Sequence, residues 1–191
     1  MTGRIVATAH WTALDREGSD TCRLSRVGEG WLLVGHARFR DDLGFATLDY
    51  VVRLGEGWQT LSADLAGSHE GRGVQARITR ENGVWRVNDA AQEGLENATD
   101  LDLSFTPATH LMPLRRLFAS AGETLDAPAA WLRYPAARLE PLDRSYTRTG
   151  LEDVIAYAAR QSGLATRLTV DRSGFVAFCP DRWEGEVTCA R

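Results

Sequence analysis

The feature that most constrains the fold is a glycine-containing turn followed by a tryptophan, which occurs three times. In each case the tryptophan is the first residue of a segment that is suited to a β-strand. Gly28–Gly30 precedes Trp31, Gly55–Gly57 precedes Trp58, and Asn82–Gly83 lies just before Trp85. Such turns followed by alternating residues are typical of β-hairpins. The even spacing of the tryptophans would fit an internal repeat. Because the intervening segments differ from one another, we interpret the pattern as a plain hairpin meander.

Alternation of apolar and polar residues predicts half-buried strands along most of the chain. In the segment 73–79, for example, Val74, Ala76 and Ile78 occupy every second position. Strands are predicted over 31–39, 45–54, 58–65, 73–79, 101–105, 129–134, 138–148, 164–170 and 175–178, the last two forming a final hairpin. We expect the residues from Glu184 onward to be loose.

One helix is predicted over 111–121. Leu114, Leu117 and Phe118 share a helical face, and Pro113 suits the first turn. The segment 151–162 is ambiguous, because its Glu, Ala and Arg content favours a helix whereas a weaker alternation favours a strand.

A meander of this many strands must protect its edges, and curling the sheet towards a barrel does so. We therefore predict a mainly β fold, a single strongly curved antiparallel sheet forming an open or half barrel. One or two short helices would lie on its concave side and plug or line it. The interior of such a sheet is either filled by side chains or hollow. At 191 residues, one domain over 1–191 is expected.

Composition restricts the class of function. The formal net charge is −4, so the basic face of a nucleic-acid binder is not expected. The cysteines Cys22, Cys179 and Cys189 are odd in number and widely spaced, which argues against a zinc or redox pair and favours a reducing compartment. Neither a signal peptide nor a membrane span is predicted. We expect a cytoplasmic protein, and no motif indicates an oligomeric state.

The sequence lacks a recognisable catalytic or metal-binding constellation. His10, His36, His69 and His110 have no metal-ligand spacing, and no nucleophile motif or dinucleotide fingerprint occurs. We therefore predict no catalytic residues, no metal and no cofactor. Cys22 precedes Arg23, which would lower the thiol pKa if the groups were close, but we favour a role as a buried, small apolar side chain.

The most unusual segment is 100–117, which joins a strand, a proline-closed turn and a short helix. Asp100 and Asp102 would share one strand face, and both an acid/base dyad and an arginine-paired structural site fit them. Polar side chains later in the segment would grip a hydroxylated or anionic head group. Alternatively, the segment is a corner that reverses the sheet.

These residues carry a resemblance to a bacterial family described as putative glycolipid-binding. The similarity begins at Trp11 and runs to about Trp183. It includes Thr21–Leu24, Tyr146–Arg148 and the final hairpin, and it is strongest at Asp100–Pro107 followed by Leu111–Leu117. The resemblance implies a strongly curved antiparallel sheet with short helices on its concave side. That fold is similar to the carriers that escort lipoproteins between membranes, and it implies a strand at about 154–159.

By position in the motifs, the candidate ligand-binding residues are Cys22, Arg23, Thr106, His110, Arg115, Arg116, Tyr146 and Arg148. The leading hypothesis is a binding protein that holds an amphipathic small molecule, such as a glycolipid, in an apolar hollow of the sheet. One alternative is an enzyme acting on a lipid or sugar derivative through His110 or the pair Asp100 and Asp102. The other is a scaffold with a filled core.

Overall fold

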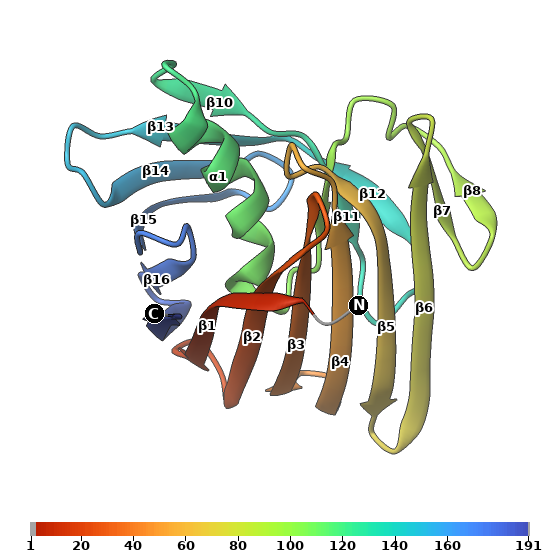
Figure 1. Cartoon of the computed structure of the whole chain (residues 1–191). Helices are drawn as coiled ribbons and strands as arrows, with labels where there is room; N and C mark the ends of the chain where they lie inside the picture. The colour runs from red at the N-terminus through yellow and green to blue at the C-terminus, as the bar shows by residue number, and fades with distance from the viewer. Residues whose placement is uncertain (1–2, 191) are drawn as a thin grey trace.

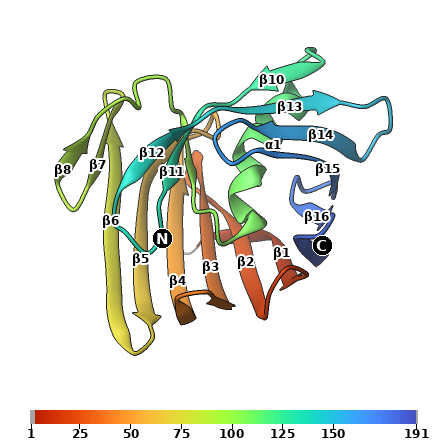
Figure 2. The ribbon, with the colours of Figure 1, turned by 180° about the vertical axis from the view of Figure 1, so that it is seen from behind.

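The computed structural model describes residues 3–190, which form a large antiparallel sheet, a small second sheet and one short helix. The large sheet has 14 strands in the order β10-β13-β14-β15-β16-β17-β1-β2-β3-β4-β5-β6-β7-β8 and does not close into a barrel. Figure 1 shows the sheet curving around the helix α1, with one arm formed by β13 to β16 and the other by β1 to β6. Figure 2 shows the same arrangement from behind. The predicted mainly β fold with a strongly curved sheet is confirmed.

The strands of the large sheet are β1 (Arg4–Ala13), β2 (Gly18–Val27), β3 (Gly30–Asp41), β4 (Gly44–Leu54), β5 (Thr60–His69), β6 (Arg72–Glu81), β7 (Val84–Val87), β8 (Ala90–Gln92), β10 (Thr124–Asp126), β13 (Arg144–Arg148), β14 (Val154–Ala159), β15 (Leu164–Val170), β16 (Val176–Cys179) and β17 (Trp183–Cys189). The small sheet contains β9 (Asp100–Asp102), β11 (Ala129–Leu132) and β12 (Leu139–Leu142). The helical segments are η1 (Pro107–His110) and α1 (Leu111–Ala119).

Alternation along the strands builds the core as predicted. In β3, Leu33, Gly35, Ala37 and Phe39 are buried, whereas the intervening residues are exposed or half-buried. Neighbouring strands are joined by tight turns, of which Asn82–Gly83 is an example. Both residues of that turn have positive φ, 51° and 81°, as the commonest two-residue hairpin turn requires.

The small sheet was not predicted, and it fills much of the hollow. β9 pairs with β11 in parallel, and β11 pairs with β12 antiparallel. Because side chains alternate across a strand, Trp131 shares one face with Asp100 and Asp102, whereas Leu132 and Leu101 lie on the other. The small sheet thus separates the two arms of the large sheet.

The helix completes the filling of the hollow. Thr106 caps η1 by accepting a hydrogen bond from the Ala108 amide, and α1 follows directly with Leu111, Leu114 and Leu117 buried. The predicted helix over 111–121 is confirmed in place but ends at Ala119, because Ser120 is extended.

Two predicted strands have different ends from those expected, for local reasons. The strand predicted over 58–65 begins at Thr60, since Trp58 has a left-handed backbone with φ 67°. The strand predicted over 101–105 corresponds to β9 and stops at Asp102, because Ser104 turns with φ 53°.

Two further predictions change because of long-range pairing. The segment 138–148 is not one strand but β12 and β13, which belong to different sheets. Residues Glu184–Cys189 are not loose, since they belong to β17, which lies between β16 and β1. Arg191 lies outside the described residues. The ambiguous segment 151–162 contains the strand β14, as the resemblance implied, and not a helix.

Candidate functional site

A small, partly enclosed cavity lies between the small sheet and the strands β14 to β17. One side is formed by β9, the turn before η1 and β11, and the other by Tyr157, Leu164 and Trp183. Its lining combines aromatic, polar and aliphatic side chains: Asp102, Ser104, Thr106, Pro107, His110, Trp131, Leu142, Tyr157, Ser162, Leu164, Cys179, Arg182 and Trp183. The polar side chains of Asp102, Thr106, His110 and Arg182 thus lie in one cavity.

The volume of this cavity corrects the expectation of a wide apolar hollow. It measures about 110 Å³, room for three or four water molecules at about 30 Å³ each. Pockets that enclose drug-sized ligands are typically about 300–1,000 Å³. The helix α1 and the small sheet occupy much of the hollow of the large sheet (Figures 1 and 2).

His110 lines the cavity and contacts two tyrosines, Tyr157 in the cavity wall and Tyr146 behind it. Its Nδ1 lies 2.7 Å from the Tyr146 hydroxyl, and its ring packs edge-on against Tyr157 with centroids 4.8 Å apart. Burial lowers the pKa of His110 to about 4, although the charge of Asp102 opposes the change. His110 is therefore neutral at pH 7, and its ring nitrogens offer one donor and one acceptor.

A buried chain of ion pairs runs from the cavity to the helix. Arg144 donates to Asp102 at 2.9 Å and to Asp100 at 3.1 Å, and Arg116 binds both oxygens of Asp100 at 2.8 and 2.7 Å. The side chains of Arg144 and Asp100 are fully buried. Two carboxylates facing two guanidinium groups are neutral as a set, which makes their burial tolerable.

A third buried carboxyl group, Asp20, lies behind Thr106. Its Oδ2 accepts hydrogen bonds from the Thr106 hydroxyl and, at 2.8 Å, from the Tyr50 hydroxyl. Its Oδ1 is buried and has no partner within residues 3–190. Burial raises the pKa of Asp20 to about 6, against the hydrogen bonds from Thr106 and Tyr50, which lower it.

Comparison with known proteins places this architecture in a family. The family model described as putative glycolipid-binding matches residues 8–185. The chain belongs to this family. The resemblance drawn from the motifs is thereby confirmed, and no curated protein matches the sequence.

Two solved structures resemble this family member. A DUF1089 family protein from Pseudomonas aeruginosa superposes with a TM-score of 0.73 at 23% identity, covering 86% of this chain and 91% of that one. A β-barrel-like protein of the domain of unknown function DUF1849 from Brucella abortus has a TM-score of 0.55 at 12% identity, with all of both chains covered. Both similarities concern the fold.

Three of the predicted ligand-binding residues of this family member meet at the cavity. Thr106 and His110 line it, and Tyr146 lies directly behind His110. Cys22 is fully buried beneath this region, and burial raises the pKa of its thiol, so it fills space as a small apolar side chain. Arg23, next to it in β2, is exposed on the outer face.

The other predicted arginines lie away from the cavity. Arg115 stacks on Trp58, with 4.8 Å from its guanidinium carbon to the ring centroid, while Arg116 pairs with Asp100. Arg148 donates hydrogen bonds to the carbonyls of Leu117 and Ser120 at the end of α1. The structure therefore divides the predicted set into a cavity group, three arginines that hold α1 in place, and Cys22 and Arg23, which belong to neither group.

Sequence reasoning missed Asp20, Tyr50, Arg144 and the cavity tryptophans Trp131 and Trp183. A signal existed for the charged residues. In β2, Asp20 lies on the same, buried face as Cys22 and Leu24. In β13, Arg144 lies on the same, buried face as Tyr146. A charge on the apolar face of a strand indicates a buried partner.

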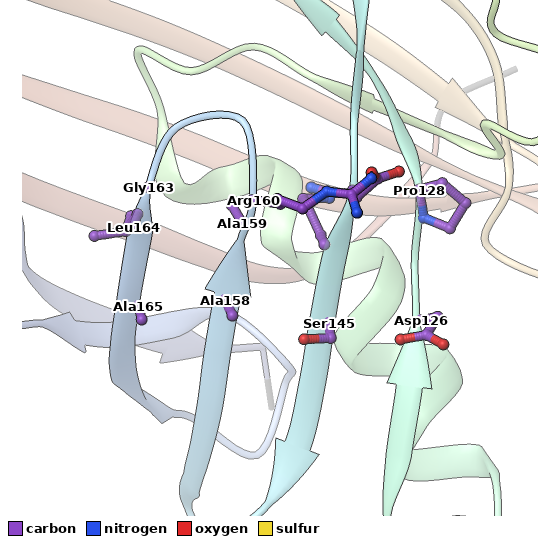
Figure 3. A pocket seen from close by; sticks show the side chains of 11 residues that line it. Asp126, Pro128, Ser145, Ala158, Ala159, Arg160, Gly163, Leu164 and Ala165 are labelled. Atoms are coloured by element: carbon purple, nitrogen blue, oxygen red, sulfur yellow. The ribbon is translucent and has the colours of Figure 1, made fainter.

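A larger but shallow concavity lies elsewhere, on the outer face of β10, β13, β14 and β15 (Figure 3). It measures about 640 Å³ and is shallow and open, because its floor consists of the small side chains of Ala158, Ala165 and Ser145. The exposed ion pair between Asp143 and Arg160 lies at one end.

Within residues 3–190, no three His, Cys, Asp or Glu side chains gather as metal ligands would. The helices of the same part of the chain include none that is long and apolar enough to cross a membrane.

The raised pKa of Asp20 predicts a pH effect on stability. Its folded pKa of about 6 exceeds the unfolded value of about 3.9, so the native state holds the proton more tightly. The resulting stabilisation is complete below about pH 4 and is lost as the pH rises through about 6. At about 1.36 kcal/mol per pKa unit, the ionised form costs on the order of 3 kcal/mol.

The check is urea unfolding of the wild type and Asp20→Asn at pH 4 and pH 7. The asparagine keeps the acceptor for Tyr50 and Thr106 but does not ionise. We expect the variant to gain on the order of 3 kcal/mol relative to the wild type between pH 4 and pH 7. An unchanged difference between the two proteins at both pH values would show that Asp20 titrates normally.

Proposed function

We propose that this protein binds the carbohydrate head group of an amphipathic molecule in the partly enclosed cavity. The observation that carries the proposal is the lining itself. Trp131, Tyr157 and Trp183 supply aromatic surface, and Asp102 and His110 supply polar groups, all within one cavity. A sugar ring has an apolar face of C–H groups, which packs on aromatic rings, and an edge of hydroxyl groups, which needs donors and acceptors.

The polar side of the cavity is suited to hydroxyl groups. Asp102 accepts from Arg144 and from the Ser104 amide, which holds its carboxylate in place while leaving acceptor capacity. Neutral His110 is oriented by Tyr146. Preorganised donors and acceptors of this kind lower the cost of ordering the site when a ligand binds.

The size of the cavity sets which part of the ligand enters. At about 110 Å³ it accommodates a portion of one sugar unit and not a long alkyl chain. The apolar part of the ligand would therefore remain outside this cavity. The family's description as putative glycolipid-binding agrees with this division.

The ion pairs support binding rather than catalysis as the role of the buried acids. Asp100 and Asp102 are both matched by Arg144, which leaves neither positioned as a free general acid. We also propose a reducing compartment such as the cytoplasm, because Cys22, Cys179 and Cys189 are free thiols.

A titration with methyl glycosides of glucose, galactose, mannose and N-acetylglucosamine tests the proposal through tryptophan fluorescence. We expect a saturable change with at least one of them. Trp131→Ala should weaken that binding about tenfold, which corresponds to about 1.4 kcal/mol. The matched control is Trp31→Phe, which changes a tryptophan that does not line the cavity. Absence of saturation with all four glycosides, or equal weakening in both variants, would contradict the proposal.

A further inference from the structure

Two buried polar atoms lie without partners at the opposite rim of the hollow. Within residues 3–190, His69 Nε2 and the Tyr134 hydroxyl form no hydrogen bond. His69 ends β5 and is 9% exposed, and Tyr134 lies in the loop between β11 and β12. Their rings stack with centroids 5.5 Å apart at an angle of 22°. Buried polar groups normally have hydrogen-bond partners. The two unpartnered atoms therefore indicate a place where a polar group of a ligand binds.

Asp41 supplies a third polar group to the same place. Its Oδ1 lies 3.5 Å from His69 Nε2, too far for a normal hydrogen bond, and accepts from the Leu43 amide at 2.9 Å. Burial and the charge of Asp41 raise the pKa of Tyr134 to about 12. The Tyr134 hydroxyl thus stays protonated and available as a donor, next to a carboxylate acceptor.

An apolar groove begins beside these groups. A cavity of about 170 Å³ lies between the inner face of β5 and β6 and the loop after β11, lined among others by Leu65, Val74, Ala76, Leu132 and Pro135. Val74 and Pro135 also border the concavity that contains His69 and Glu70. The groove and the polar groups therefore form one continuous site with an apolar end and a polar end.

This site is separate from the partly enclosed cavity. Trp131 lines the cavity and Leu132 lines the groove, and adjacent residues of a strand point to opposite faces. The small sheet thus stands between the two sites. A ligand in the groove does not need the cavity to be occupied.

The charges at the rim select the kind of head group. Acidic groups outnumber arginines in the two concavities that border the polar end, with Asp15, Glu17, Asp41, Asp42 and Glu70 against Arg16, Arg40 and Arg72. The excess of negative charge disfavours an anionic head group. A hydroxyl group can accept from Tyr134 and donate to Asp41 or His69, which matches the free atoms. A water molecule would serve the polar end but would leave the apolar groove unexplained.

We infer that the groove binds a short hydroxylated alkyl chain. The hydroxyl group lies among Asp41, His69 and Tyr134, and the methylenes lie against Leu65, Val74 and Leu132. The inference does not depend on carbohydrate binding in the partly enclosed cavity, and either can hold without the other.

Titration with 1-hexanol, followed by amide shifts in NMR spectra, tests the inference. We expect saturable shifts along β5, β6 and the loop 133–137. Tyr134→Phe removes a hydroxyl group that has no partner in the fold, and it should weaken binding at least fivefold. Val74→Trp should fill the groove and abolish binding. Ala136→Trp, in the exposed loop, provides a second filling variant if Val74→Trp unfolds.

Trp131→Ala is the control and should leave the binding of 1-hexanol unchanged, since Trp131 lies on the other face of the small sheet. Sodium hexanoate should bind at least fivefold more weakly than 1-hexanol. The inference is overturned if 1-hexanol gives no saturable shifts, if Tyr134→Phe binds it as well as the wild type, or if hexanoate binds equally well. Shifts confined to residues around Trp131 and Tyr157 would also overturn it.

Discussion

Replacing Arg144 with alanine is expected to lower the free energy of unfolding by about 3–5 kcal/mol. The guanidinium group of Arg144 is fully buried and is shared by Asp100 and Asp102. Without Arg144, the buried carboxylates of Asp100 and Asp102 have too little positive charge beside them. The free-energy cost of these unmatched charges exceeds the cost of the lost packing contacts. Since domains are stable by about 5–15 kcal/mol, the variant should lose a large part of its stability in urea unfolding.

Arg160→Ala is the matched control for this substitution. Arg160 follows β14, which pairs with the strand of Arg144, and forms an ion pair with Asp143, but its side chain is 81% exposed. An exposed ion pair contributes about 0–1 kcal/mol. Equal losses in the two variants would show that burial of the charges is not what makes Arg144 important.

A second set of variants separates charge from packing. Arg144→Met fills similar space but still leaves the carboxylates unmatched, so it should be almost as unstable as Arg144→Ala. Adding Asp100→Asn and Asp102→Asn to Arg144→Met removes the unpaired charges and should restore much of the lost stability. If the triple variant is no more stable than Arg144→Met, the ion pairs do not explain the effect.

Gly35→Ala is expected to cost about 3 kcal/mol, because overpacking and a lost hydrogen bond to a carboxylate each cost about 1–3 kcal/mol. A Cβ atom at position 35 would lie 2.1 Å from Tyr50 Cζ and 2.2 Å from its hydroxyl oxygen. The ring of Tyr50 lies directly across Gly35, and only glycine leaves room for it. Displacing the ring breaks the hydrogen bond from Tyr50 to Asp20.

The control for Gly35→Ala is Gly73→Ala, since a Cβ atom at Gly73 meets no atom within 4 Å. We expect little change there in thermal unfolding. In the double variant Gly35→Ala/Tyr50→Leu the clash is absent, so its cost should be smaller than the sum of the single costs. Additive costs would mean that Gly35 and Tyr50 do not interact as the structure shows.

Local patterns were sufficient to predict β3 to β6, but not β1 and β2, which precede them, or β7 and β8, which follow. β3 to β6 are joined by short turns, and their alternation shows in the chain itself. β14 differs, because its alanine-rich composition favours a helix. Its strand is imposed by pairing with β13 and β15, with Tyr157 opposite Tyr146. Composition cannot reveal pairing of this kind, whereas the family resemblance could.

The filled hollow was beyond sequence reasoning for a related reason. The parallel pairing of β9 with β11 is long-range, and no local motif announces it. The ion pair between Arg144 and Asp100 joins residues 44 positions apart. The motif 100–117 did locate Thr106 and His110 at the cavity. The same motif placed Arg116 among possible ligand contacts, whereas the fold directs it to Asp100.

Strand β1 lies between β2, which follows it in the chain, and β17, the last strand. During synthesis, therefore, the strands β1 to β8 leave the ribosome long before the neighbour on the other side of β1 exists. Until then β1 presents an open edge, which is prone to pair with other chains. The junction that completes the sheet pairs Ala7 with Cys189, and contacts between such distant residues slow folding. The nascent chain is thus expected to need protection until its final residues emerge.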